Sequence, residues 1–597
     1  MGYSAVVKRI LIGVLLLTGV SSAYAEGLPG AQPDPVSTEV APESIPRDTR
    51  LRARPGDEPR PVQYPAFIYE SVPDIESSAS EFSPVFDRWR MFYTGKWYDP
   101  YNQNVLKADI PVFGRPDHPW FFELAMISDT LFEYRQLPIP VGGASTENPE
   151  ATDTFGDGRQ GVVVENFVFS IALVQGNTTF RPQDFEFRAV PVVSVNHADV
   201  EEDGALRADP TRGTDRTDNH IGFLELFVDY HLANLTHRYD FLSLRAGIQK
   251  FNSDFRGFIF SDEAPGVRLF GNFEDNIYQY NLGWFSRLDK DTNSGINTFD
   301  SRHEDVFVAN LYRQDTPVLG HTVQASVLHR IDSAGNYGQD YDNNGFLVRP
   351  AAIGDERPKN LQTTYFGITG DGHFDRINSS AALYYVTGSE SHNQIAGKHV
   401  DISASMAALE LSYDKDWMRF RTSFFWASGD DDAFDDEANG FDAIFDVPNF
   451  AGGDISFWQR QGIPLVGGGG VNLVNRNSLL PNLRPGKEEG QSNFVNPGLR
   501  LFNLGVDFEI TPKLKLINNV SFLQFDDTSS LRAVRQDGSI DRSIGFDVSS
   551  GLLYRPFLNN NVQFRFGGAV LFPEEGTENL FGDETLFDIF SNVILQY

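Results

Sequence analysis

The segment from Asp340 to Gly345 has the residue spacing of the first half of a calcium-binding loop. It reads D-x-D-x-N-G, so the oxygens of Asp340, Asp342 and Asn344 could converge on one hard cation while the glycine permits a sharp turn. The twelfth position of such a loop needs a bidentate glutamate, but this sequence has Ala351 there. We therefore interpret the segment as a solvated turn, keep a Ca²⁺ site in this external loop as the alternative, and expect no other cofactor.

Motifs that would indicate catalysis are absent from the sequence. The 11 histidines are scattered, and there is no H-E-x-x-H, no G-x-S-x-G and no glycine-rich phosphate loop. The chain has no cysteine, which excludes disulfides, thiolate metal sites and haem attached through C-x-x-C-H. We predict that the protein is not an enzyme. The alternative, a hydrolase in an external rim, would need a clustered nucleophile and base that the sequence does not display.

Charged residues of both signs occupy alternate positions in strand-like segments. If such segments line a pore, rings of their charged side chains would decide which ions or solutes pass, and a basic ladder would favour anionic solutes. The alternative is that the opposite charges neutralise each other across the pore. The residues that we predict to line the lumen are Arg188, Glu225, Asp229, Arg245, Arg330, Glu410, Arg419, Arg421, Asp507, Glu509, Lys515, Arg555 and Arg565.

Apolar and polar residues alternate along many segments from residue 119 to 597. Because successive side chains of a strand point to opposite faces, this period of two predicts one apolar face, suited to lipid, and one polar face, suited to water. The apolar face would hold Met418, Phe420, Phe424 and Trp426 in 417–427, Leu224, Leu226, Val228, Tyr230 and Leu232 in 222–235, and Ile544, Phe546, Val548, Leu552 and Tyr554 in 543–555.

The connections between these segments alternate between short and long. Lys415-Asp416 and Thr511-Pro512 are tight links, whereas 197–221, 332–361 and about 429–498 are long. This is the pattern of short periplasmic turns and long external loops, so we predict an all-β fold, a single transmembrane antiparallel β-barrel. We expect about 18 strands, with 16 as the alternative, and a strand hidden between about 251 and 304.

The first 118 residues contain three segments of different composition. Residues 1–25 have a basic start, an apolar run and Ala23-Tyr24-Ala25, which predicts a cleavable signal peptide and export from a Gram-negative cytoplasm. Residues 26–62 are rich in proline and predict a disordered periplasmic leader. Residues 63–118 are aromatic and predict a periplasmic segment or a small plug. The formal net charge of −33 makes nucleic acid an unsuitable partner.

Two further features bear on assembly and transport. The last strand places Val593, Leu595 and Tyr597 on one face, and an alternating strand that ends in an aromatic residue resembles the signal read by the outer-membrane assembly machinery. The long segment of about 429–498 contains several aromatic residues and a run of four glycines at 467–470. We predict that it folds into or over the pore as a constriction, or alternatively forms a surface cap.

The stretch from Gly429-Asp430-Asp431-Asp432 through Gly440-Phe441-Asp442-Ala443-Ile444-Phe445-Asp446 to Gly452-Gly453 resembles the alginate-export-type outer-membrane barrels. The resemblance implies an 18-stranded barrel that lets an anionic polysaccharide or small solutes cross. The lumen of that family is strongly basic, whereas this one is mixed.

We therefore predict an outer-membrane porin or export channel. Its expected surroundings are outer-membrane lipid, lipopolysaccharide and the barrel assembly machinery, with residues 26–118 as the place for a periplasmic partner. The alternative function is a barrel that anchors or sheathes such a partner, for example an electron-transfer or secretion component, without free passage of solute.

Overall fold

The computed structural model describes residues 104–115, 118–138, 158–176, 182–236, 240–463, 465, 487–558 and 560–597. The predictions for 1–25 and 26–62, most of 63–118, and the glycine run of the long loop lie outside the described residues. No helix of the described residues is long and apolar enough to cross a membrane.

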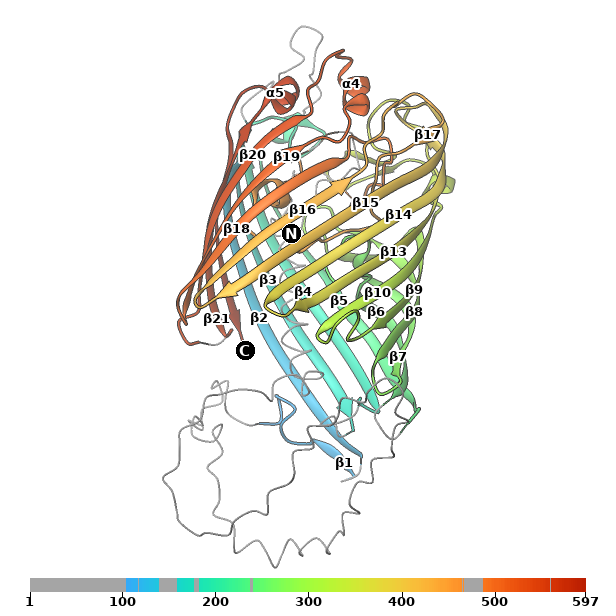
Figure 1. The fold of residues 1–597 in the computed structure, drawn as a ribbon, viewed down its shortest axis with the longest axis vertical. Helices are drawn as coiled ribbons and strands as arrows, with labels where there is room; N and C mark the ends of the chain where they lie inside the picture. The colour runs from blue at the N-terminus through green and yellow to red at the C-terminus, as the bar shows by residue number, and fades with distance from the viewer. Residues whose placement is uncertain are drawn as a thin grey trace, which may run out of the picture. The chain divides into compact units, whose positions relative to one another are not determined.

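The described strands form a closed antiparallel barrel (Figure 1). Its sheet has 20 strands, of which β1 (Phe113–Arg115) and β17 (Glu437–Ala438) are short additions at the rims. Each of the other eighteen pairs with the next along the chain, and β2 pairs with β22 to close the ring. They are β2 (His118–Gln136), β3 (Arg159–Gln175), β4 (Phe185–Val200), β5 (Asp215–Asn234), β6 (Phe241–Asn252), β7 (Ser261–Phe273), β8 (Tyr278–Lys290), β9 (Asn297–Arg313), β10 (His321–Asp332), β13 (Leu361–Phe374), β14 (Ile377–Asn393), β15 (Lys398–Lys415), β16 (Met418–Ala427), β18 (Leu499–Thr511), β19 (Leu514–Gln524), β20 (Ser543–Tyr554), β21 (Val562–Pro573) and β22 (Leu586–Gln596).

The prediction of an all-β barrel with 18 strands is confirmed, and the alternative of 16 is excluded. The region 251–304 contains β7, β8 and the start of β9. Residues 267–270 belong to β7, whereas 258–260 lie in the loop before it.

The two ends of the barrel carry different connections. At one end, two-residue turns follow β13, β15 and β18, as predicted from Lys415-Asp416 and Thr511-Pro512. At the other end lie the long loops with the short elements η2 (Pro210–Arg212), η3 (Ala334–Tyr337), β11 (Asp340–Tyr341), β12 (Leu347–Arg349), α3 (Phe457–Arg460), α4 (Ser529–Arg535) and α5 (Glu575–Phe581). Figure 1 shows α4, α5 and β17 at this end and β1 at the other.

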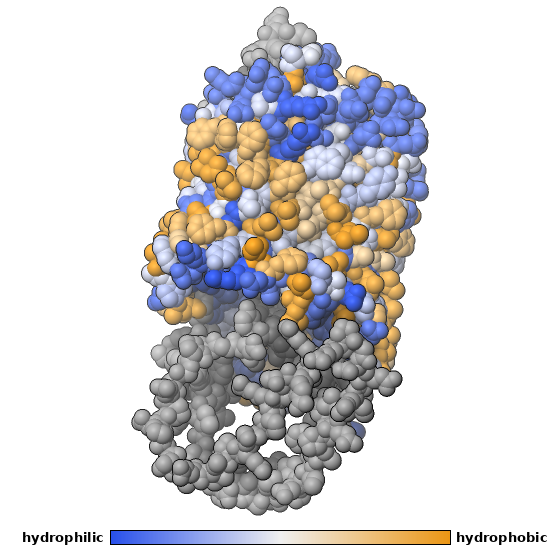
Figure 2. All heavy atoms as spheres, in the orientation of Figure 1, coloured by the Kyte–Doolittle hydropathy of each residue, from blue (hydrophilic) through white to orange (hydrophobic). Residues whose placement is uncertain are grey.

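The outer face of the barrel is apolar over most of its height. Phe366, Leu383 and Phe502 alternate with buried residues along their strands and are 48%, 59% and 47% exposed. Figure 2 shows such side chains gathered in a band on the visible face, with hydrophilic residues beyond it. A band of this kind is what a barrel in lipid requires.

Two residues predicted for the apolar outer face point inward instead. Leu224 and Ile544 are buried, with 2% and 0% exposure. The pairing of β5 with β4 shifts register next to Leu224, and the pairing of β20 with β19 shifts between Ser543 and Gly545. An extra residue in one strand reverses the faces on its far side, so a strict period of two assigns these residues wrongly.

The first described segment, 104–115, runs along the beginning of β2. The backbone N–H of Ala108 donates to Phe122 O at 3.0 Å, and that of Leu124 donates to Leu106 O at 2.7 Å. At the other end of the chain, Tyr597 exchanges backbone hydrogen bonds with Met126. Part of the segment 63–118 is therefore an added strand beside β2.

Candidate functional site

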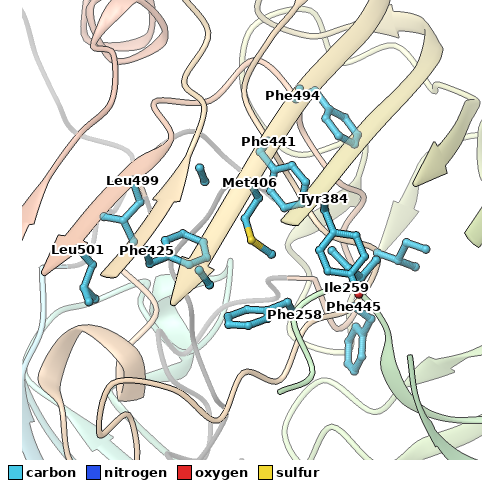
Figure 3. Close-up of a cluster of buried hydrophobic side chains, with 14 of the residues drawn as sticks. Phe258, Ile259, Tyr384, Met406, Phe425, Phe441, Phe445, Phe494, Leu499 and Leu501 are labelled. Carbon is cyan, nitrogen blue, oxygen red and sulfur yellow. The ribbon is translucent and has the colours of Figure 1, made fainter. Parts of the chain in front are cut away.

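The connection between β16 and β18 folds into the barrel. Its described parts, 428–463 and 487–498, contain 15 buried apolar residues, among them Phe441, Phe457 and Phe494. Most of these residues, including those three, belong to one hydrophobic cluster with inward side chains of the wall, such as Tyr384 and Met406 (Figure 3). The predicted constriction is thus present in the described part of the loop, and this part of the lumen is filled by protein.

A second loop supports this segment from the side. Residues 253–260, between β6 and β7, run beside it, and the N–H groups of Ile444 and Phe445 both donate to Ile259 O, at 3.1 and 3.0 Å. Phe258 packs on Phe425 and Phe450 with ring centroids 6.0 and 5.4 Å apart. Residues 258–260 therefore act as packing partners of the constriction.

One anchor of the long loop is a charged cluster at β2 and β22. Arg460 lies 3.3 Å from Glu133 and 3.2 Å from Asp588. Gln461 donates to Glu133 at 2.6 Å and accepts from Arg135 Nη1 at 2.7 Å. All five side chains are buried, so both charges of each pair are shielded from solvent and held in place by further hydrogen bonds.

The other anchor lies at β9 and β10, eight strands away around the ring of eighteen. Arg302 donates to the backbone carbonyls of Glu488, at 2.6 Å, and Gly490, and Arg330 donates to Ser492 Oγ at 2.6 Å. Both arginines also contact Glu304, which fixes their positions. The described parts of the loop are thus held at nearly opposite walls of the barrel.

A polar chamber of about 490 Å³ lies against the loop segment 449–455. Glu410 accepts the N–H of Ala451 at 2.9 Å and pairs with Arg256 at 3.3 Å, so it links the wall to both loops. Lys515 and Arg421 line the chamber beside Asp507, at 3.0 and 3.7 Å. The chamber thus carries charges of both signs, which is the mixed lumen expected from the sequence.

A glycine permits the close approach of the loop to the wall here. Gly452 has a φ of 72°, and a Cβ at this position would collide with the amide of Asn519 in β19. Asn519 in turn accepts a hydrogen bond from Arg421 Nη2.

The predicted lumen residues fall into several groups. Arg188 and Arg245 lie in a cluster with Glu123, Glu186 and Asp229, near β2, β4 and β5. In this cluster Arg188 Nε donates to Glu186 at 2.6 Å, and Arg245 Nη2 lies 2.8 Å from Asp229. Arg330 belongs to the second anchor. Those placed at or near the chamber are Glu410, Arg419, Arg421, Asp507, Glu509, Lys515 and Arg565, and Glu225 is buried beside the Arg188 cluster.

One of these predictions is wrong in its placement. Arg555 lies in the turn after β20, which ends at Tyr554, and its N–H donates to Lys513 O at 2.8 Å. A strand boundary that is wrong by one residue is enough to move a side chain from the wall to the rim.

The anchor residues were not among the predicted sites. They are Glu133, Asp588, Arg302, Glu304 and Arg460. Their charges occupy alternate strand positions, which could have indicated the four wall residues, whereas Arg460 lies in a loop.

The segment 340–345 is a turn whose acidic residues have separate partners. Asp340 pairs with Arg349, and Asp342 Oδ1 accepts the N–H groups of Asn344 and Phe346 at 2.9 and 2.7 Å. Within the described ranges, no group of three or more His, Cys, Asp or Glu side chains is placed to hold a metal ion. The structure does not bring Asp340, Asp342 and Asn344 together as one ligand set, because the carboxylate of Asp340 pairs with Arg349.

Comparison with known proteins gives similarity at the level of structure. No family model matches the chain, and no curated protein matches it. OccK9 (OpdG) of Pseudomonas aeruginosa is similar with 10% identity and a TM-score of 0.45, covering 80% of this chain and 98% of that one. OccAB3 of Acinetobacter baumannii has 8% identity and a TM-score of 0.44, covering 80% and 99%. A BenF-like porin of Pseudomonas fluorescens Pf-5 has 9% identity and a TM-score of 0.43, covering 80% and 98%.

Proposed function

We propose that this chain is an outer-membrane porin that passes small solutes through a lumen narrowed by the loop between β16 and β18. The closed barrel with its apolar outer band supports a place in a membrane. The observation that carries the proposal is the attachment of this loop to nearly opposite walls, at Arg460 and at Ser492. A barrel that only anchored a partner would have no need for a constriction held so firmly.

A small solute fits the lumen better than a polysaccharide. The chamber beside the loop has a volume of about 490 Å³, which lies within the size range of small-molecule pockets. The F-D-x-x-F motif that resembles the alginate-export barrels has a packing role here, since Phe441 and Phe445 are buried in the hydrophobic cluster. We therefore place polysaccharide export second, behind the passage of small solutes.

The chamber would select solutes by charge through acidic and basic side chains that line it together. Asp371 and Glu410 come from β13 and β15, and Arg421 and Lys515 come from β16 and β19. A solute in the chamber therefore meets groups of both signs. We propose these residues, rather than the full set predicted from the sequence, as the determinants of selectivity.

The test is the single-channel conductance of the refolded barrel in a planar bilayer. The wild type should give discrete steps, and a variant in which 440–490 is replaced by a short Gly-Ser linker should give larger ones. A matched variant that shortens the exposed segment 207–213 should conduct like the wild type, because it leaves the lumen unchanged. A folded barrel that is silent in all three forms would contradict the porin and favour the anchoring role.

A further inference from the structure

Three loops meet at the long-loop end of the barrel. Thr292, in the loop between β8 and β9, donates through Oγ1 to Glu489 Oε1 at 2.6 Å, and the same Oγ1 accepts the N–H of Asn343 at 3.1 Å. Asn343 also donates to Asp291 Oδ1 at 3.2 Å. Thr292 therefore joins the turn 340–345 to the inward loop that follows residue 487.

Two carboxylates at this junction are buried with one oxygen unused. Asp342 and Glu489 are 8% and 7% exposed. Oδ1 of Asp342 accepts backbone N–H groups and Oε1 of Glu489 accepts from Thr292, whereas Oδ2 and Oε2 have no hydrogen-bond partner in the described part of the chain. A buried carboxylate oxygen without a partner is costly, and each one in a folded protein calls for an explanation.

The charges around the junction do not supply the missing partner. Asp291 lies next to Asn343, and Asp218 accepts from Asn293 at 2.5 Å, so two more carboxylates stand close by. Arg302 is already paired with Glu304 at 2.7 Å. Arg216 acts electrostatically on Asp342 and Arg302 acts on Glu489, but among the described residues neither arginine donates a hydrogen bond to the unused carboxylate oxygens.

The pKa values of Asp342 and Glu489 reflect their burial among other carboxylates. Burial raises the pKa of Glu489 to about 8, and the charge of Asp342 adds to this effect. Burial also raises the pKa of Asp342, against its backbone hydrogen bonds. Two carboxylates in such surroundings either take up a proton or share a cation.

We propose that Asp342 and Glu489 bind one Ca²⁺ ion through Asp342 Oδ2 and Glu489 Oε2, and that the ion ties the inward loop to the external turn. Calcium suits the site because it accepts six to eight hard oxygen ligands in irregular geometry, which amide, carbonyl and solvent oxygens can complete. Asn344, in the same turn, offers an amide oxygen whose hydrogen bond from Asn293 is long, at 3.4 Å. This ligand set differs from the one that the sequence suggested, because it draws on a second loop.

The experiment is a calcium titration of the full chain, refolded in detergent without lipopolysaccharide, by isothermal calorimetry and by thermal unfolding in Ca²⁺ against EDTA. The variants are Asp342→Asn and Glu489→Gln, which keep the shape and remove the charge. Asp431→Asn is the matched control, because this acid is exposed in another loop. We expect one ion per chain in the wild type and control with a higher Tm in Ca²⁺, and at least a tenfold weaker affinity in both variants.

Two results would overturn the proposal. One is no binding by the wild type at millimolar Ca²⁺ while both variants have a raised Tm in EDTA, which would show that the carboxylates share a proton. The other is binding that neither variant weakens, which would place the ion elsewhere. The binding readout does not depend on conduction, so its failure is distinguishable from a failure of the porin proposal.

Discussion

Arg460 of the inward loop lies 3.2 Å from Asp588 of β22, and both side chains are buried. Arg460 also stacks on the ring of Phe590, 3.7 Å from its centroid. Removing one member of a buried pair leaves the other uncompensated and costs about 3–5 kcal/mol. The barrel itself is held together by the hydrogen bonds between its strands. Loss of the Arg460–Asp588 ion pair should therefore change the position of the loop and not the fold of the barrel.

We therefore expect Arg460→Gln to raise single-channel conductance and its noise, because the loop is released from one wall. Arg357→Gln, which alters an exposed ion pair with Asp355, should change neither. The measurement is conductance in a planar bilayer, with gel mobility of the unheated protein as the check on folding. Unchanged conductance in a folded Arg460→Gln variant would show that this pair does not hold the constriction.

The lack of cysteine in the chain makes accessibility of the chamber directly measurable. Lys515→Cys places a thiol beside Asp507 in the lumen, and we expect a charged methanethiosulfonate reagent to change the conductance within seconds to minutes. Leu504→Cys is the control, because Leu504 is 55% exposed on the apolar outer face. A reagent effect at Leu504 but not at Lys515 would mean that the two faces are assigned in reverse.

Charge selectivity should depend on the individual acidic and basic side chains that line the chamber. Lys515→Gln should shift the reversal potential in a salt gradient toward cation preference, and Glu410→Gln should shift it toward anion preference. Arg500→Gln removes a positive charge on the outside of β18, where Arg500 pairs with Asp526 at 2.7 Å, and should leave the potential unchanged. Equal potentials in all forms would assign these charges to neutralisation of each other across the lumen.

The barrel could be predicted from the sequence because its signal is local. Each strand needs only its own alternation, and the wall residues Arg421 and Asp507 follow from it. The alternation fails where one residue is inserted, as at Leu224 and Ile544, because pairing with a neighbouring strand, and not the strand's own residues, decides the register.

The interior of the barrel could be predicted only in part. The length and aromatic content of the loop indicated a constriction, but nothing near Arg460 indicates that it meets Asp588 of β22. Likewise, the spacing of 340–345 pointed to Asp340, whereas Arg349, nine residues later, holds this carboxylate. Contacts between residues far apart in sequence depend on how the loop runs through the barrel. The residues on either side of each position do not determine this course, so the contacts could not be predicted.

The acidic turn after β16 should make stability depend on pH. Asp430 is fully buried and accepts the N–H of Asn439 at 3.0 Å. Burial, with a smaller contribution from Asp435, Asp431 and Asp432, raises its pKa to about 7. The unfolded chain, with the ordinary pKa near 3.9, then binds fewer protons than the folded one between these two values, so this group lowers stability as pH rises from about 4 to about 7.

We therefore expect Asp430→Asn to raise the Tm at pH 8 and to change it much less at pH 4, where Asp430 is protonated in the folded state and about half protonated in the unfolded chain. Asp431→Asn, at the exposed neighbouring position, should alter the Tm little at either pH, since its carboxylate stays solvated. The measurement is thermal unfolding followed by circular dichroism from pH 4 to 8. A stabilisation equal at both pH values would mean that the asparagine acts through its hydrogen bond to the backbone and not through the lost charge.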